Sequence, residues 1–333
     1  MKSRREVLKT GVELAGAYAA AAFFRPWSAL AQQPQTGSTL VLLGTQGGPN
    51  INLNRSEAAS ALLVNGRPYL IDCGYGTLRA LLQANIRAID IANVFITHLH
   101  DDHTADIAAF LTHRWTNGNT NPAKVTVHGP YGTAAMVEGA IAFFKANTEI
   151  RMVDEGRTVR PETIFSGHDA SAPKVSEVFS DDRVTVLAME NAHFPDRAKA
   201  KMPYRSFAYR FNTPTRSFVF SGDTAYSAGL IELARGADVL VCEAMSMAAR
   251  QQREGDRGNT NAESIGRHVL ETHSSTEEVG RMAAEAKVKT VVLNHLLGGP
   301  GQRGTAAPAD PFTADVKKYF DGEVIVGADQ MRI

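Results

Sequence analysis

Cysteine is scarce in this chain, which has only Cys73 and Cys242 among its 333 residues. Two thiols cannot build a disulfide framework or a four-cysteine zinc site, and the sequence leaves open whether these two bond to each other. Charge of one sign is not in excess either, because 35 acidic residues balance 35 basic ones. This balance argues against a strongly basic nucleic-acid-binding surface. With 44% hydrophobic and 21% charged residues, the composition is typical of a folded protein with a buried core.

The N-terminal segment has the organisation of an export signal. Basic residues occupy segment 1–9, an apolar run follows at residues 14–24, and Ala29-Leu30-Ala31 ends the segment, which is typical of a cleaved secretory signal. The apolar run is too short to span a bilayer, so no stable membrane anchor is expected. The residues around Arg4 and Arg5 resemble the twin-arginine (Tat) motif.

We therefore expect residues 1–31 to be a Tat signal peptide, cleaved near Ala31, and residues 32–333 to form one domain that is exported to the periplasm. The Tat translocase would be the partner during export. It carries folded proteins with their cofactors, so a metal could be inserted in the cytosol. A basic amphipathic N-terminal helix is the alternative interpretation.

Along the remaining chain, apolar segments with the length of strands alternate with segments of helical periodicity. Asn65-Gly66 between two apolar runs predicts a tight hairpin, and residues 132–146 are predicted to form one helix. The polar segments 250–261 and 296–311 are expected to be mobile loops. Adjacent strand pairs and alternating helices together predict mixed sheets covered by helices.

Metal-binding side chains gather in one short segment, because His98, His100, Asp102 and His103 directly follow a predicted apolar strand. A histidine pair alone would be more simply explained as packed or solvated. Three further candidates follow other predicted strands, however: His193, Asp223 and His295. Strand ends meet at one edge of a sheet, so we expect these side chains to converge there.

Nitrogen and carboxylate ligands without thiolates fit Zn²⁺, with Mn²⁺ or Fe²⁺ as alternatives. Seven candidate ligands are too many for one tetrahedral ion. They fit two ions that share one carboxylate, an arrangement that can activate water and polarise a scissile bond. The sequence therefore predicts two Zn²⁺ ions per chain.

This pattern resembles the metallo-β-lactamase superfamily, and several motifs resemble its ribonuclease Z-like and arylsulfatase-like branch. The resemblance covers about residues 38 to 333 in family order. It implies an α+β fold, a four-layer αβ/βα sandwich of two mixed sheets flanked by helices, with the metals at the edge between the sheets. The motifs that carry it lie at residues 42–45, 70–77, 128–133, 239–244 and 273–276.

The resemblance also implies a role for each candidate ligand. One ion would be held by His98, His100 and His193. The second would be held by Asp102, His103 and His295, and Asp223 would bridge the two ions. A metal-bridging hydroxide would attack the substrate, with Asp102 orienting it or taking its proton.

Three further residues have roles implied by the same resemblance. Asp72, after a predicted strand, would hydrogen-bond a ligand histidine from behind; without the resemblance it is equally well explained as a turn or capping carboxylate. Glu243 and His273 would form a dyad beside the leaving group, with Glu243 holding His273 in the form that donates a proton.

The expected activity is that of an exported dinuclear zinc hydrolase acting on a small ester-like substrate, of the phosphodiester or aryl sulfate type. Ribonuclease Z itself acts on precursor transfer RNA in the cytosol. An export signal, zero net charge and the absence of a long basic arm between His103 and His193 argue against a nucleic-acid partner. A homodimer is left open.

Three other interpretations compete with ester hydrolysis. Fold-level analogy alone does not separate ester hydrolysis from a lactonase or a hydrolytic dehalogenase. An iron oxidoreductase of the same superfamily would use a mononuclear site, whereas Asp102 and His103 provide ligands for a second ion. A non-catalytic metal-binding protein would have no reason to keep all seven ligands.

The paired arginines give the first testable prediction. Replacing both, Arg4→Lys with Arg5→Lys, should leave the protein uncleaved in the cytoplasm, because a Tat signal requires the arginine pair. Fractionation of cells followed by immunoblotting measures this. Normal periplasmic recovery of the double variant would rule out Tat dependence.

Overall fold

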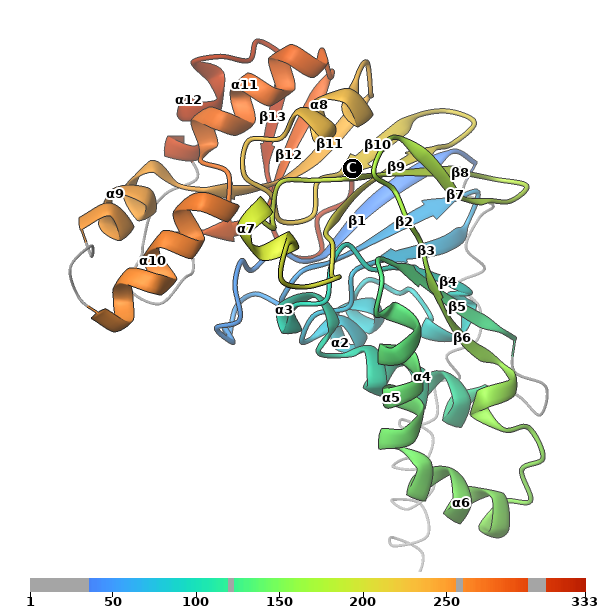
Figure 1. The fold of residues 1–333 in the computed structure, drawn as a ribbon. Helices are drawn as coiled ribbons and strands as arrows, with labels where there is room; N and C mark the ends of the chain where they lie inside the picture. The colour runs from blue at the N-terminus through green and yellow to red at the C-terminus, as the bar shows by residue number, and fades with distance from the viewer. Residues whose placement is uncertain (1–35, 119–122, 256–259, 299–309) are drawn as a thin grey trace, which may run out of the picture. The chain divides into compact units, whose positions relative to one another are not determined.

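The computed structural model describes residues 36–118, 123–255, 260–298 and 310–333, without the side chains of 252–255, 260–265 and 310. The expected signal peptide, residues 1–31, lies outside the described residues. Two β-sheets, each covered on one face by helices, organise the chain from Thr36 to Ile333 (Figure 1).

The first sheet contains six strands in the order of the sequence. Its first three strands pair antiparallel and the later ones pair parallel. The strands are β1 (Ser38–Gly44), β2 (Ala59–Val64), β3 (Arg67–Ile71), β4 (Asn93–Phe95), β5 (Val125–Gly129) and β6 (Phe165–Asp169).

The second sheet contains seven strands in the order β13-β12-β11-β10-β9-β8-β7. Strands β10 to β13 pair parallel and β7 to β10 pair antiparallel, so this sheet is mixed as well. Its strands are β7 (Ser176–Ser180), β8 (Thr185–Glu190), β9 (Phe207–Asn212), β10 (Ser217–Phe220), β11 (Val239–Met245), β12 (Thr290–Leu297) and β13 (Glu323–Val326).

Helices complete the outer layers. The helices of the first half are α2 (Thr77–Gln83), α3 (Asp101–Thr104), α4 (Ile107–Asn117), α5 (Thr133–Phe143) and α6 (Lys145–Asp154), with short 3₁₀ turns at Ala88–Asp90 and Pro161–Thr163. Those of the second half are α7 (Asp196–Lys199), α8 (Ala228–Ala234), α9 (Met247–Gly255), α10 (Thr260–Thr272), α11 (Thr276–Ala286) and α12 (Asp310–Lys317). No helix of the described residues has both the length and the apolar character that crossing a membrane requires.

Three buried clusters separate the layers. One lies between the first sheet and helices α2, α4 and α5, and another between the second sheet and helices α8, α11 and α12. The third joins the inner faces of the two sheets, where the ring of Phe95 lies 5.7 Å from that of Tyr209 and 5.0 Å from that of Phe211. This layering confirms the predicted four-layer αβ/βα sandwich.

Short sequence motifs that act through the backbone form the structures expected of them. The hairpin between β2 and β3 turns at Asn65 and Gly66, with φ of 47° and 79°, the left-handed values that a type I′ turn needs. At the start of α11, Ser275 accepts from the N–H of Glu278, and the Glu278 carboxylate accepts from the N–H of Ser275. This capping box holds His273, two residues upstream, at a fixed helix start.

Several sequence predictions were wrong in the fold. The described part of segment 250–261 is helical, because α9 continues to Gly255 and α10 begins at Thr260, while residues 256–259 lie outside the described residues. This polar segment is rich in good helix formers, and polarity was mistaken for irregular structure. The helix predicted at residues 132–146 ends at Phe143 and a second helix follows. In the segment 296–311, β12 continues to Leu297 and residues 299–309 lie outside the described residues.

The two cysteines do not pair. Cys73 and Cys242 are both free and buried. Cys73 packs in the cluster beneath the first sheet and Cys242 in the cluster beneath the second, where each acts as a small apolar side chain.

The aromatic core between the sheets gives a stability prediction. Phe95→Ala should lower the free energy of unfolding by about 3–5 kcal/mol, because it leaves a cavity where both sheets meet. Phe143→Ala is the matched control: its ring is 82% exposed, so its effect should stay within about 0.5 kcal/mol. Urea unfolding followed by circular dichroism measures both. Equal losses for the two variants would contradict this account of the core.

Candidate metal centre

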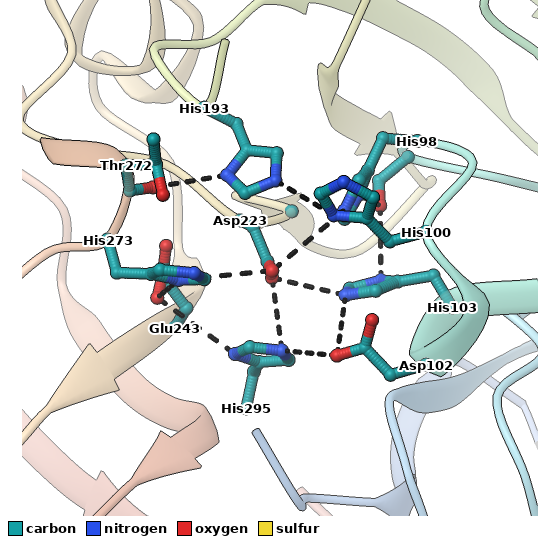
Figure 2. A network of polar contacts seen from close by, with 12 residues as sticks. His98, His100, Asp102, His103, His193, Asp223, Glu243, Thr272, His273 and His295 are labelled. Atoms are coloured by element: carbon teal, nitrogen blue, oxygen red, sulfur yellow. Dashed lines mark hydrogen bonds and ion pairs between the residues drawn. The ribbon is translucent and has the colours of Figure 1, made fainter. Parts of the chain in front are cut away.

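All seven predicted ligands lie together at one edge of the two sheets (Figure 2). The first sheet supplies four of them from the turn after β4 and from helix α3. The second sheet supplies His193 after β8, Asp223 after β10 and His295 within β12. Six of the seven therefore follow a strand as expected from the sequence, whereas β12 continues past His295 to Leu297.

Three histidines form the first cluster. His100 Nδ1 lies 3.0 Å from His98 Nε2 and 3.1 Å from His193 Nε2. Two ring nitrogens this close cannot both carry a proton. At least one nitrogen of each pair therefore presents a lone pair to the space between the rings. Burial and the neighbouring imidazoles lower the pKa of His98, and burial chiefly lowers that of His193. The rings are therefore neutral, the form that binds a metal.

The orientation of His193 is fixed from behind. Its Nδ1–H donates to the carbonyl oxygen of Thr272 at 3.1 Å. This bond sets the tautomer, so Nε2 is left as the inward-facing acceptor.

The second cluster joins Asp102, His103, Asp223 and His295. His295 Nε2 lies 3.2 Å from Asp102 Oδ2 and 3.3 Å from Asp223 Oδ1. Burial raises the pKa of Asp102, but His103 and His295 outweigh it and hold that pKa at about 2. Asp102 is therefore an ionised carboxylate that attracts positive charge.

This second cluster fits a divalent cation. His103 Nε2 and Asp223 Oδ1 are buried and make no hydrogen bond within the described part of the chain. An unsatisfied nitrogen and oxygen facing each other at 3.2 Å are costly in a dry interior unless a further group binds both. Imidazole and carboxylate are the donor set that Zn²⁺ and similar ions prefer.

Asp223 lies between the two clusters. Its carboxylate is 3.2 Å from His103 and 3.9 Å from His98, one member of each cluster, and Figure 2 shows it at the centre of the network. Gly222 before it has φ of 57°, and a Cβ there would lie 2.9 Å from Thr97. The tight turn that presents Asp223 therefore requires glycine.

Asp72 supports the second cluster from below. Its Oδ2 accepts from His103 Nδ1 at 2.9 Å, and its Oδ1 accepts from the N–H of Thr97 at 2.8 Å. The contact with a ligand histidine is the one expected from the sequence. It leaves Nε2 of His103 free to face the cluster.

Glu243 and His273 lie side by side at the edge of the second cluster. His273 Nδ1–H donates to Glu243 Oε2 at 2.8 Å, and the same ring nitrogen is 3.9 Å from Asp223. Burial lowers the pKa of His273, but the carboxylates of Glu243 and Asp223 outweigh it and raise that pKa to about 9. A protonated imidazole is thus stabilised beside the predicted metal ligands.

Comparison with known proteins agrees with this geometry. Residues 67–296 match the family model described as a beta-lactamase superfamily domain. The chain belongs to the metallo-β-lactamase superfamily. Its relatives include ribonuclease Z of Mycobacterium sp. (strain KMS), 31% identical over 82% of this chain and 90% of that protein. Ribonuclease Z of Mycobacterium bovis (strain BCG / Pasteur 1173P2) is 28% identical over 88% and 97%.

Solved structures share the same fold. A metallo-beta-lactamase fold protein from Bacillus subtilis superposes with a TM-score of 0.61 at 19% identity, covering 89% of this chain and 98% of its own. The short form of human tRNase Z gives a TM-score of 0.58 at 21% identity, covering 89% and 98%. As a member of this superfamily with ribonuclease Z homologues, the chain is a metal-dependent hydrolase, which confirms the expected class.

Sequence reasoning missed one residue of this superfamily member's site. No motif of the sequence singles out His268 on α10, yet its ring centre lies 6.2 Å from that of His100, 5.9 Å from His193 and 6.1 Å from His273. Helical periodicity through residues 260–272 was the signal that would have placed it one turn before Thr272. The rings of His128 and His168 meet edge to face instead, with 5.8 Å between their centres.

The contact between Asp72 and His103 gives a prediction. Asp72→Asn should weaken zinc binding by about 10- to 100-fold, because the supporting hydrogen bond is lost. Competition with a chromophoric chelator measures it. Asp90→Asn is the control, since Asp90 pairs with Arg87 on the surface. Equal zinc affinity in both variants would show that Asp72 does not support the metal site.

Proposed function

We propose that this protein is an exported dinuclear zinc hydrolase that cleaves a small ester-like substrate of the phosphodiester or aryl sulfate type in the periplasm. The observation that carries the proposal is the position of Asp223, 3.2 Å from His103 of one cluster and 3.9 Å from His98 of the other, directly beside the Glu243–His273 pair. Each cluster suits one ion, and the pair suits a leaving group.

The seven candidate ligands fall into three groups by the ion that they would hold. His98, His100 and His193 would hold one ion, Asp102, His103 and His295 the other, and Asp223 both. When bound, the ions supply Lewis acidity for the scissile bond and increase the acidity of water.

The chain's own groups move the protons. Water adds its oxygen to the phosphorus or sulfur, and Asp102, ionised by its neighbours, accepts the hydrogen bond or proton of that water. The bond to the leaving oxygen breaks, and His273 donates a proton to that oxygen. Glu243 keeps the His273 ring oriented through the bond at Nδ1, so Nε2 is the donating atom.

The segment between His103 and His193 favours the hypothesis of a small substrate. Among its described residues, 104–118 and 123–192, helix α6 projects beyond the two sheets (Figure 1), but its two basic residues are balanced by two acidic ones, so it is not a basic arm. The balanced charge of the chain agrees. A ribonuclease is the second candidate, favoured by the relatives named ribonuclease Z.

A substrate panel tests the proposal. Mature protein loaded with Zn²⁺, Mn²⁺ or Fe²⁺ is assayed with nitrophenyl phosphodiester, aryl sulfate, carboxylate ester and lactone substrates, and with precursor transfer RNA. Turnover of the phosphodiester or sulfate supports it. Activity confined to RNA would establish the ribonuclease instead, and activity confined to lactones would establish a lactonase.

Metal content gives a further prediction. Purified wild-type protein should contain about two divalent ions per chain, and Asp102→Ala should lose one ion and most of kcat, because Asp102 belongs to one cluster and accepts the proton of water. Mass spectrometry of the metals and steady-state kinetics measure this. The neighbouring Asp101 is exposed, so Asp101→Ala should match wild type. Full turnover by Asp102→Ala with one ion per chain would exclude a dinuclear mechanism.

The proton donor is tested through the leaving group. His273→Ala should slow esters of poor leaving groups by about 10²–10⁴-fold, and nitrophenyl esters far less, because nitrophenolate leaves without protonation. Glu243→Gln should show a weaker form of the same pattern. The measurement is kcat against leaving-group pKa. An equal loss across leaving groups would make His273 a binding or structural residue.

A further inference from the structure

A charged cavity opens next to the histidine clusters and is not used by the chemistry described above. Its volume is about 500 Å³, and it is lined by Arg197 of α7 with Arg267, His268 and Glu271 of α10. The helix α10 that forms one wall leads directly into His273.

His268 connects this cavity to the site. Its ring lies about 6 Å from the rings of His100, His193 and His273, as given above. A substrate whose ester bond is held at the clusters can therefore extend past His268. Because the ring of His268 lies 6.1 Å from that of His273, the proposed donor to the leaving oxygen, the part of the substrate that enters is assigned to the leaving group.

The lining has an excess of positive charge. Arg197 forms an ion pair with Glu271, which cancels one arginine. Arg267 is exposed to solvent, and among the side chains that the structure describes no ion pair or hydrogen bond involves it. Among the described lining residues two guanidinium groups face one carboxylate, whatever the charge of His268, so this part of the cavity attracts an oxyanion.

We propose that this cavity is a specificity subsite for a leaving group that carries its own oxyanion, a carboxylate or a phosphate, with Arg267 as the residue that binds it. The inference rests on the proposed function and narrows its substrate class: a small diester or sulfate ester whose leaving alcohol or phenol is itself anionic. Glu271 holds Arg197 in place and limits the affinity by its opposite charge.

The test compares matched aryl esters of whichever acid the enzyme hydrolyses. One has a carboxylate on the leaving phenol, the second a neutral carboxamide at the same position, and the third a phosphate. The ratio of kcat/KM for each anionic ester over the amide is measured in wild type and variants, so that intrinsic reactivity cancels. The carboxylate and phosphate arms identify which oxyanion is preferred.

Two variants should shift this ratio in opposite directions. Arg267→Gln should lower it by about tenfold, mainly through KM, because a charged hydrogen bond is lost. Glu271→Gln should raise it, because the opposing charge is removed and Arg197 is released. Arg87→Gln, a surface arginine paired with Asp90, should leave the ratio unchanged. Ratios that are equal in wild type and both cavity variants would overturn the subsite.

Binding separates this inference from the proposed function. Calorimetric titration of the metal-loaded protein with 4-hydroxybenzoate and with 4-hydroxybenzamide needs no turnover. If no ester is hydrolysed but the carboxylate binds more tightly than the amide and Arg267→Gln abolishes the difference, the subsite stands and the proposed reaction fails. Equal binding of the two phenols overturns the subsite whatever the activity.

Discussion

Asp223 is a carboxylate that is 2% exposed and sits among imidazoles from both halves of the fold. Burying a single carboxylate in a protein interior costs several kcal/mol unless positive charge compensates it. Asp102 and Glu243 are equally enclosed, at 4% and 2% exposure. The histidines offset part of this negative charge, and divalent cations are the natural complement of the rest. The surrounding architecture serves to keep these groups together at one point.

The two sheets are tied to each other directly beneath the site. The N–H of Phe207 on β9 donates to the carbonyl of Thr97 at 2.8 Å, and the Tyr209 hydroxyl donates to the carbonyl of Ile96 at 2.9 Å. Both acceptors lie between β4 and His98. The segment that supplies four predicted ligands is therefore fixed to the sheet that supplies the other three, and the aromatic core below it resists any sliding between the sheets.

Much of this site was predictable, because strand ends converge and the ligand types are chemically specific. The backbone details were not. His295 is the extra residue of a bulge between β11 and β12 and has φ of 42°, while Asp72 has φ of 57°. Left-handed conformations of non-glycine residues cost about 1–3 kcal/mol. Contacts with the surrounding fold offset that cost, so the local sequence does not predict these two left-handed conformations. The edge strands β6 and β7 were missed for another reason: mostly polar, partly exposed residues form them.

The failure to predict His268 on α10 from the sequence also has a functional explanation. The predicted metal ligands lie at or near the ends of strands, and the buried apolar runs of those strands are easy to recognise in the sequence. The residues that we propose to border the leaving group come from α7 and α10, and these carry exposed arginines and glutamates that contribute little to any core. Substitutions on such surfaces cost little stability. Changes in these helices can therefore alter the substrate without disturbing the sheet edge, and Arg267, His268 and Glu271 lie where we propose that such a change acts on the leaving group.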